Sequence, residues 1–344
     1  MSKVVEVDYS ALGEGDFVAV NDFENAMGAE ALPDDPPTPL ERTVAWMTNI
    51  PSHLAYREFW VRDDKRVVGL ADAMWRNTEE NRHLAWIDLQ VLAPYRGRGI
   101  GRELLRQIVE IVKEDNRTVL SVQTTDRVPA GEAFARRVGA EAKQTVHTNR
   151  LLMSDVDRGL VRSWLDEAPG RAPGYSLVAV DGPLPDDIVE NAVRALDVMN
   201  TAPRDDLDWE DSRLTVEQMR EIEKAGVAEG TERWFVFARH DATGEFVGVT
   251  EMFWNPSKPK TVYQGDTGVH PDHRGHALGK WLKATTADRL IRERPQVEDI
   301  RTGNADSNDA MLGINHALGF KPYIEHVNWQ VAVDAVDRYL DQSV

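Results

Sequence analysis

The 344-residue chain contains no cysteine. Disulfide bonds, cysteine-ligated zinc and a covalent acyl-cysteine intermediate are therefore excluded. Positive charge is also scarce, because 40 Lys and Arg residues stand against 58 Asp and Glu residues and leave a formal net charge of −18. A negative field of this size disfavours nucleic acid and anionic membranes as partners, and it attracts small cationic molecules.

Long apolar runs are missing as well. A membrane helix needs about 18 consecutive apolar residues, and no stretch of the sequence is that long. Residues 1–8 show no apolar core followed by a cleavage site. We therefore expect a cytoplasmic protein. We also expect it to act as a monomer or homodimer. The length predicts about two domains, and a hydrophobic content of 42% is sufficient for two cores.

A glycine-rich turn stands between two regular segments in the first half. Residues 84–91 read as a strand, and residues 100–112 repeat apolar side chains at helical spacing. The first N–H groups of a helix are unpaired and carry the positive end of its dipole, and glycine lets a ligand approach them closely. The turn is therefore typical of a phosphate-binding loop. Its residues are Arg96, Gly97, Arg98, Gly99, Ile100 and Gly101.

The same arrangement recurs 178 positions later, from Val91 to Val269. The second loop comprises Val269, Arg274, Gly275, His276, Ala277, Leu278 and Gly279. Strand carboxylates recur too, since Asp72 corresponds to Glu251 and Asp88 to Asp266. Such a repeat indicates an internal duplication. We predict two domains, 1–165 and 166–344, with a boundary in the Pro- and Gly-rich stretch 168–174.

The pattern Arg-x-x-Gly-x-Gly, with Val five residues before the Arg, resembles the acetyl-CoA pyrophosphate loop of the GNAT (GCN5-related N-acetyltransferase) superfamily. The resemblance covers nearly the whole chain and implies two tandem α/β domains, each a mixed sheet with helices on both faces. Segments 143–152 and 323–333 would close the first and the second sheet. It also implies an enzyme, an acyltransferase that takes acetyl-CoA as co-substrate, uses no metal and acetylates a primary amine of a small molecule by direct attack.

In that family acetyl-CoA wedges between two splayed strands. The resemblance implies that backbone groups around Leu89, Val91 and Val269 pair with its pantetheine arm. It also implies coenzyme contacts from Asn304 and Asn308, at the start of a helix expected over 304–318. The tyrosine that often protonates the leaving thiolate is replaced by Ala135 in the first half and by Asn315 in the second. A catalytically inactive CoA-binding sensor or scaffold therefore remains the alternative.

The general base is left among several strand residues. A carboxylate whose pKa is raised by burial can deprotonate an ammonium acceptor. The candidates are Asp88, Glu251 and Asp266, with Asp72, His83 and Gln264 also open.

The first half is favoured as the acetyl-CoA site, because the methyl group of Ala277 would crowd a pyrophosphate and would be strained at positive φ. The acidic stretch 205–211 falls between the first two helices of the second half, where the resemblance implies that acceptors enter, and is interpreted as a lid suited to a cationic amine. His270, His273 and His276 are interpreted as loop residues and not as metal ligands, because Pro271 interrupts their spacing.

Overall fold

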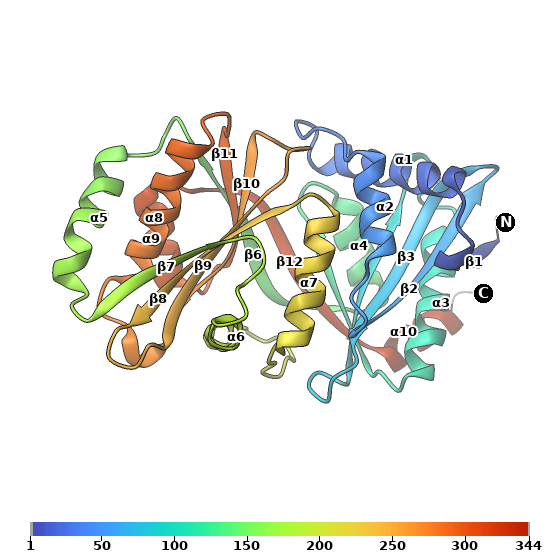
Figure 1. Cartoon of the computed structure of the whole chain (residues 1–344). Coiled ribbons are helices and arrows are strands. Elements are labelled where there is room, and N and C mark those ends of the chain that lie inside the picture. Colours follow the sequence, from blue (N-terminus) through green and yellow to red (C-terminus); the bar gives the residue numbers. More distant parts are fainter. Residues whose placement is uncertain (1–2, 343–344) are drawn as a thin grey trace. The chain divides into compact units, whose positions relative to one another are not determined.

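The computed structural model describes residues 3–342, which divide into two compact units. Unit 1 consists of the chain up to Thr145, the segment Asp205–Glu210 and the chain from Glu325 onward. Unit 2 consists of Val146–Arg204 and Asp211–Ile324 (Figure 1). Each unit therefore contains residues from both halves of the sequence.

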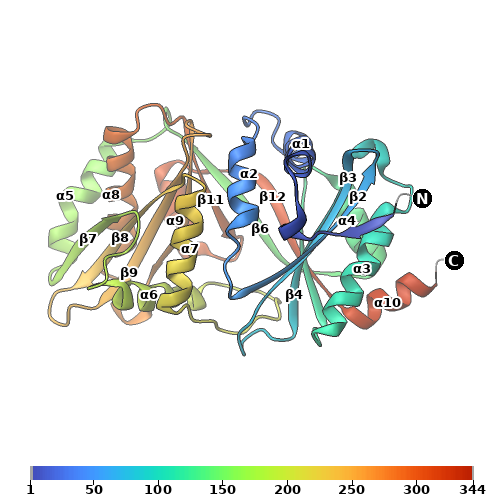
Figure 2. The same cartoon turned by 45° about the vertical axis from the view of Figure 1, so that its right-hand side comes forward.

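The sheet of unit 1 has the strand order β1-β2-β3-β4-β5-β12. These strands are Val4–Glu6, Leu54–Asp63, Arg66–Arg76, Leu84–Val91, Val119–Thr125 and Lys321–Ala332. Helices α1 (Glu14–Ala31) and α2 (Leu40–Thr48) cover one face of this sheet, as Figure 2 shows. Helices α3 (Ile100–Glu114), α4 (Pro129–Val138) and α10 (Val333–Asp341) cover the other face.

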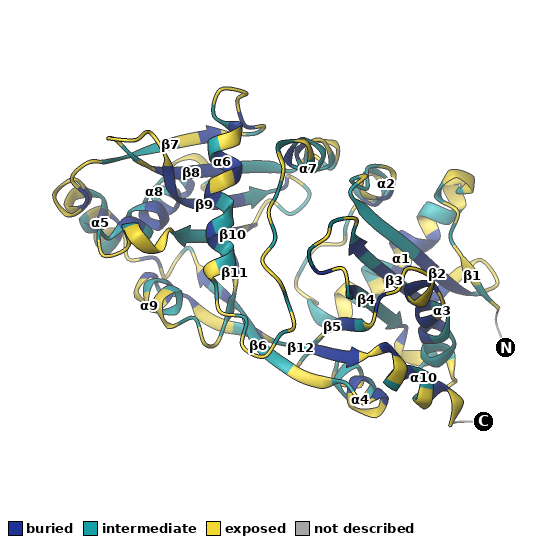
Figure 3. Ribbon diagram, turned by 90° about the horizontal axis from the view of Figure 1, so that it is seen from below, coloured by how far each residue is buried: buried dark blue, intermediate teal, exposed yellow. Residues whose placement is uncertain are grey.

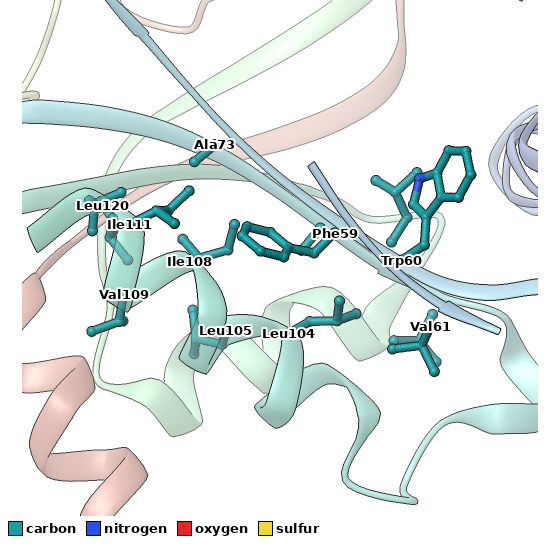
Figure 4. Packing of buried hydrophobic residues seen from close by; sticks show 14 of the residues in the cluster. Phe59, Trp60, Val61, Ala73, Leu104, Leu105, Ile108, Val109, Ile111 and Leu120 are labelled. Carbon is teal, nitrogen blue, oxygen red and sulfur yellow. The ribbon is translucent and has the colours of Figure 1, made fainter. Parts of the chain in front are cut away.

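The core of unit 1 lies between α3 and the sheet (Figure 4). Leu104, Leu105 and Ile108 of α3 are buried, and they lie in one cluster with Phe59 and Ala73 of the strands. The helical spacing of apolar residues after the first glycine loop is thereby confirmed, because these positions recur on one side of the helix.

The sheet of unit 2 has the strand order β6-β11-β10-β9-β8-β7. In chain order these strands are Glu141–Leu152, Tyr175–Asp181, Glu232–His240, Phe246–Trp254, Thr261–Val269 and Asp299–Ala305 for β6 to β11. Helices α6 (Val189–Leu196) and α7 (Val216–Ala228) pack on one face. Helices α5 (Arg158–Arg171), α8 (Leu278–Glu293) and α9 (Asp309–Leu318) pack on the other, and Figure 3 shows the buried strands between the two helix layers. Short 3-10 turns lie at Tyr9–Ala11, Ala93–Tyr95, Asp197–Thr201 and Pro271–His273.

The closing strands are exchanged between the two halves of the sequence. Strand β12 pairs antiparallel with β5, from His326 opposite Thr125 to Ala332 opposite Val119. Strand β6 pairs antiparallel with β11, from Val146 opposite Ala305 to Leu152 opposite Asp299. The expectation that 143–152 closes the first sheet and 323–333 the second is therefore wrong. Alternating side chains specify a strand and its buried face, but they do not specify which sheet edge it joins.

The α/β fold with mixed sheets and helices on both faces is confirmed in both units. The division into domains 1–165 and 166–344 was inferred from the repeat in the sequence, and it stays a prediction. The boundary expected at 168–174 stays a prediction as well, although α5 continues through Pro169 to Arg171. Its buried Val161 and Trp164 lie in the core of unit 2, and tertiary packing outweighs the local helix-breaking tendency of proline. Among residues 3–342, no helix is both long and apolar enough to cross a membrane.

Candidate functional site

Two parallel strands separate in the middle of each unit. In unit 1, β4 pairs with β5 only from Leu84 to Trp86, whereas it pairs with β3 all the way to Val91. In unit 2, β10 pairs with β11 only from Thr261 to Tyr263. Beyond these points, backbone N–H and C=O groups on one side of β4 and β10 lie outside the ladder. A peptide-like ligand arm can satisfy such groups.

The first glycine loop lies at the end of β4, at the open end of this gap. Gly97 and Gly99 have φ of 74° and 86°, and Gly99 is the N-cap of α3. A Cβ atom at either position would meet no heavy atom within 4 Å, so the backbone is open to a ligand. The first N–H groups bonded inside the helix are those of Arg102 and Glu103, which donate to the Gly99 carbonyl. The preceding amides therefore point out of the helix start, as an anion site requires.

The second loop has the same shape with a non-glycine residue at its corner. Gly275 has φ of 89°, and Ala277 is the left-handed N-cap of α8 with φ of 55°. Ala277 thus has the positive φ at which strain was expected, because its Cβ makes this conformation unfavourable. The first loop therefore fits a diphosphate better than the second.

The loop arginines brace the loops through their side chains. Arg96 donates from Nε to the Val91 carbonyl (2.9 Å), and its two Nη atoms bind Glu30 at 2.7 and 2.6 Å. Arg274 donates in the same way to the Val269 carbonyl (3.0 Å) and to the Thr201 hydroxyl (2.9 Å). The carboxylate of Glu30 therefore neutralises much of the positive charge of Arg96. Arg98 is exposed and lies over the Tyr95 ring at 5.2 Å.

A row of carboxylates crosses the unit 1 sheet on the face that α1 and α2 cover. Glu58 of β2 lies directly opposite Asp72 of β3, and Asp72 lies directly opposite Asp88 of β4. Directly opposite residues share a face with Cβ atoms about 5 Å apart. Glu24 of α1 adds a fourth carboxylate, whose charge interacts with those of Glu58 and Asp88. We call Glu58, Asp72 and Asp88 the acidic row.

Burial and mutual repulsion raise the pKa values of these groups. The pKa of Asp72 is raised to about 8 by burial and then by the charges of Asp88 and Glu58. The pKa of Glu24 is raised to about 7 by burial and then by the charges of Glu58 and Asp88. Burial also raises the pKa of Asp88, whose carboxylate accepts a hydrogen bond from the Gln90 amide. A carboxylate with a pKa near neutrality is matched to proton transfer from an ammonium group.

Glu58 is the most buried member of the row, at 2% exposure. It accepts hydrogen bonds from the Tyr9 and Tyr56 hydroxyls and from the Trp60 indole. Sequence reasoning found Asp72 and Asp88 but missed Glu58 and Glu24. For Glu58 a signal was present, because it is a lone carboxylate inside an aromatic and apolar strand.

On the corresponding face of unit 2, the negative charge of Glu251 is neutralised. Phe235 lies opposite Glu251, at the position that Glu58 holds in unit 1. The guanidinium of Arg233 binds Glu251 at 2.6 and 2.9 Å. A bulge between Gln264 and Thr267 takes Asp266 out of register with Glu251, and burial raises the pKa of Asp266 to about 6. Unit 2 therefore keeps one partly buried acid with a raised pKa where unit 1 assembles a row.

The two predicted coenzyme asparagines lie at different kinds of position. Asn308 is the N-cap of α9 and accepts a hydrogen bond from the Met311 N–H (3.3 Å). Asn304 lies on β11 and not in a helix, since α9 begins only at Asp309. Its Oδ1 accepts from Asn315 (2.7 Å) and Asn149 (3.4 Å), both fully buried. The roles of Asn304 and Asn308 toward a coenzyme stay predictions.

The acidic stretch lies elsewhere than expected. Asp205–Glu210 belongs to unit 1 and not to the acceptor side of unit 2. Asp208 lies 3.2 Å from His83, and the Trp209 and Trp86 rings lie 5.0 Å apart. The three loop histidines have other contacts. His270 accepts a hydrogen bond from the Asp272 N–H (3.3 Å). A hydrogen bond of 2.9 Å joins His273 to the Tyr175 hydroxyl, and His276 packs on the Tyr175 ring. In the described part of the chain, no group of three or more His, Asp or Glu is arranged to hold a metal ion.

Comparison with known proteins agrees with this architecture. The chain matches the acetyltransferase (GNAT) family over residues 21–140 and 196–320. It matches no curated protein sequence significantly. It is similar in structure to a tandem GNAT protein from the clavulanic acid biosynthesis pathway, with 27% identity, 97% of this chain and 99% of that chain covered and a TM-score of 0.78.

A GCN5-related N-acetyltransferase from Sphaerobacter thermophilus shares the fold, with 12% identity, 96% of each chain covered and a TM-score of 0.64. The family match extends over both halves of the sequence, and each matched region contains one glycine loop and one pair of splayed strands. The chain therefore belongs to the GNAT acetyltransferase family and has its tandem, two-module form.

Proposed function

We propose that this protein transfers the acetyl group of acetyl-CoA to the primary amine of a small molecule, and that the transfer takes place in unit 1. The observation that carries the proposal is the acidic row beside the point where β4 leaves β5. Family membership supports acyl transfer in general, and the row supports an amine as the acceptor.

The residues of unit 1 suit acetyl-CoA. The open amides around Gly99 would hold its diphosphate, and the unpaired edge of β4 from Ile87 to Val91 would hold its pantetheine arm. When bound, acetyl-CoA supplies an activated acetyl thioester. The left-handed Ala277 and the Arg233–Glu251 pair make unit 2 the weaker candidate.

The acidic row performs two tasks in this mechanism. Its negative charge holds the acceptor as an ammonium ion, and Asp88, on the strand next to the gap, removes one proton from it. The free amine then attacks the acetyl carbonyl carbon, a C–N bond forms, and the C–S bond breaks to release the thiolate. The attacking nitrogen passes a second proton to water as the neutral amide forms, and water delivers a proton to the thiolate, because Ala135 stands where a tyrosine would do so.

The test is thiol release from acetyl-CoA in the presence of a panel of primary amines. Turnover with any amine supports the proposal. Binding of acetyl-CoA without turnover on a broad panel would contradict it and would favour a CoA-binding sensor or scaffold, the alternative that the absent tyrosines suggest.

A further inference from the structure

The segment Asp205–Glu210, which we call the acidic strap, comes from the second half of the sequence but packs within unit 1. Its side chains alternate: Leu207 and Trp209 are half-buried, and Asp206, Asp208 and Glu210 are exposed. This is the alternation of an extended segment with one face against protein.

Two buried amide side chains fix the backbone of the strap. The Asn81 amide donates to the Glu210 carbonyl (3.1 Å) and accepts from the Glu210 N–H (2.8 Å), and the Asn81 backbone N–H donates to the Glu210 carboxylate (2.7 Å). Gln330 binds both the N–H (2.9 Å) and the carbonyl (3.1 Å) of Asp208. Asn81 and Gln330 are only 3% and 4% exposed, so these bonds are held in a fixed place. Trp209 stands between the two anchored residues.

The base of the strap is closed within unit 2. Arg204 binds Asp211 at 2.6 Å, and Asn200 exchanges two hydrogen bonds with Ser212. A loop closed at its base and packed through its own side chains is pre-organised, as in Ω-loops. The strap is therefore a built element of unit 1.

Trp209 meets unit 1 at the point where the strands separate. Its partner Trp86 is the last β4 residue paired with β5, opposite Ser121. Asp88 follows two residues later on the same face of the strand. The pair of indole rings thus borders the acidic row at the end nearest the gap.

Aromatic side chains also surround the other end of the row. The Tyr56 hydroxyl binds Glu58 (3.1 Å), and the Tyr56 ring lies 5.3 Å from Trp46 and 6.1 Å from Tyr9. Carboxylates flanked by aromatic faces bind an ammonium group through charge and through cation–π attraction, and the faces favour an apolar body next to that charge.

We propose that the acceptor is a primary amine carried on an aromatic or other apolar group, and that Trp209 of the strap is a specificity-determining residue for it. This inference rests on the proposed function for the identity of the site. It adds that a residue from the second half of the sequence selects the substrate of the first.

The experiment compares phenethylamine with ethanolamine in the full-length protein. Wild type should bind phenethylamine more tightly by calorimetry and should show a higher kcat/KM for it. In Trp209→Ala, the ratio of kcat/KM for phenethylamine to kcat/KM for ethanolamine should fall about tenfold through KM, while kcat and acetyl-CoA affinity stay within twofold. Trp209→Phe should restore most of this ratio.

Asp208→Asn and Asp205→Asn form a matched pair, because both remove one charge from the strap but only Asp208 contacts His83. Asp208→Asn should weaken phenethylamine binding more than Asp205→Asn does. Equal preference for the two amines in wild type, or an unchanged preference in folded Trp209→Ala, would overturn this inference alone. Selective amine binding without thiol release would instead overturn the proposed function and leave this inference standing.

Discussion

Asp72 and Asp88 lie directly opposite each other on neighbouring antiparallel strands of unit 1. Two carboxylates in this arrangement disfavour simultaneous ionisation, and the pKa of Asp72 is accordingly raised to about 8 by burial and by its neighbours. In the proposed mechanism this pair supplies the proton acceptor for the amine, and in the folded state it carries an energetic cost.

That cost predicts how stability depends on pH. The folded pKa of Asp72 lies above its unfolded value, so the folded state binds more protons between about pH 4 and pH 8. The contribution of Asp72 to the free energy of unfolding therefore falls as pH rises through this window, by at most about 1.4 kcal/mol per pH unit. Asp72→Asn should gain stability relative to wild type as pH rises from 4 to 8, measured by urea unfolding. Parallel pH–stability curves for Asp72→Asn and wild type would contradict the assignment.

Removal of the proposed base should affect only one unit. Asp88→Asn should lower kcat for acetyl transfer by about 10²- to 10⁴-fold with little change in acetyl-CoA affinity, because a general base contributes about this much. Asp266→Asn, at the corresponding position of unit 2, should leave kcat within about twofold, as is usual for a group outside the reaction. The reverse result, with Asp266→Asn inactive, would place the reaction in unit 2.

The two glycine loops can be distinguished by introducing negative charge. Gly99→Glu and Gly275→Glu both enter left-handed positions with open space around them. Gly99→Glu should weaken acetyl-CoA binding in calorimetry by more than about tenfold, since a carboxylate would stand beside the diphosphate. Gly139→Glu is the control, because Gly139 has nearly the same φ (88°) but is the C-cap of α4 and not part of either glycine loop. Acetyl-CoA affinity that falls only in Gly275→Glu would refute the choice of unit 1.

Ala277 offers a test of backbone strain. A left-handed alanine costs about 1–2 kcal/mol, and glycine loses about 0.5–1 kcal/mol in chain entropy, so Ala277→Gly should raise the free energy of unfolding by up to about 1.5 kcal/mol. The control Ala26→Gly, at an exposed position inside α1, should instead lower it by about 1 kcal/mol. Loss of stability in both variants would show that Ala277 is not strained.

Lys283 provides a second pH-dependent prediction. It is 2% exposed, donates to Gln264 Oε1 at 2.8 Å and corresponds by the repeat to Leu105 of unit 1. Burial lowers its pKa to about 7, so between about pH 7 and pH 10 the unfolded state binds more protons than the folded state. The destabilisation by Lys283 is therefore complete below pH 7 and declines as pH rises. Lys283→Leu should gain most stability at pH 6–7 and progressively less toward pH 10, and a gain independent of pH would contradict this account.

Local patterns carried much of the fold and of the site. The glycine loops and the amphipathic spacing after them, as at Leu104 and Ile108, depend on residues close together in the chain, and the structure has them where expected. Asp72 and Asp88 were identified in the same way, from matched strand positions in the two halves. Glu24 was not, because only the packing of α1 brings it near the acidic row.

The sequence by itself determined the duplication, the α/β class, the two loops and the unusual residue at Ala277, since each follows from spacing and composition within a short segment. Only the tertiary structure decided that β12 joins β5, that β6 joins β11 and that Trp209 lies on Trp86. An alternating strand or an acidic loop is compatible with several partners. The choice among them is made by the summed packing and hydrogen bonding of residues far apart in the chain.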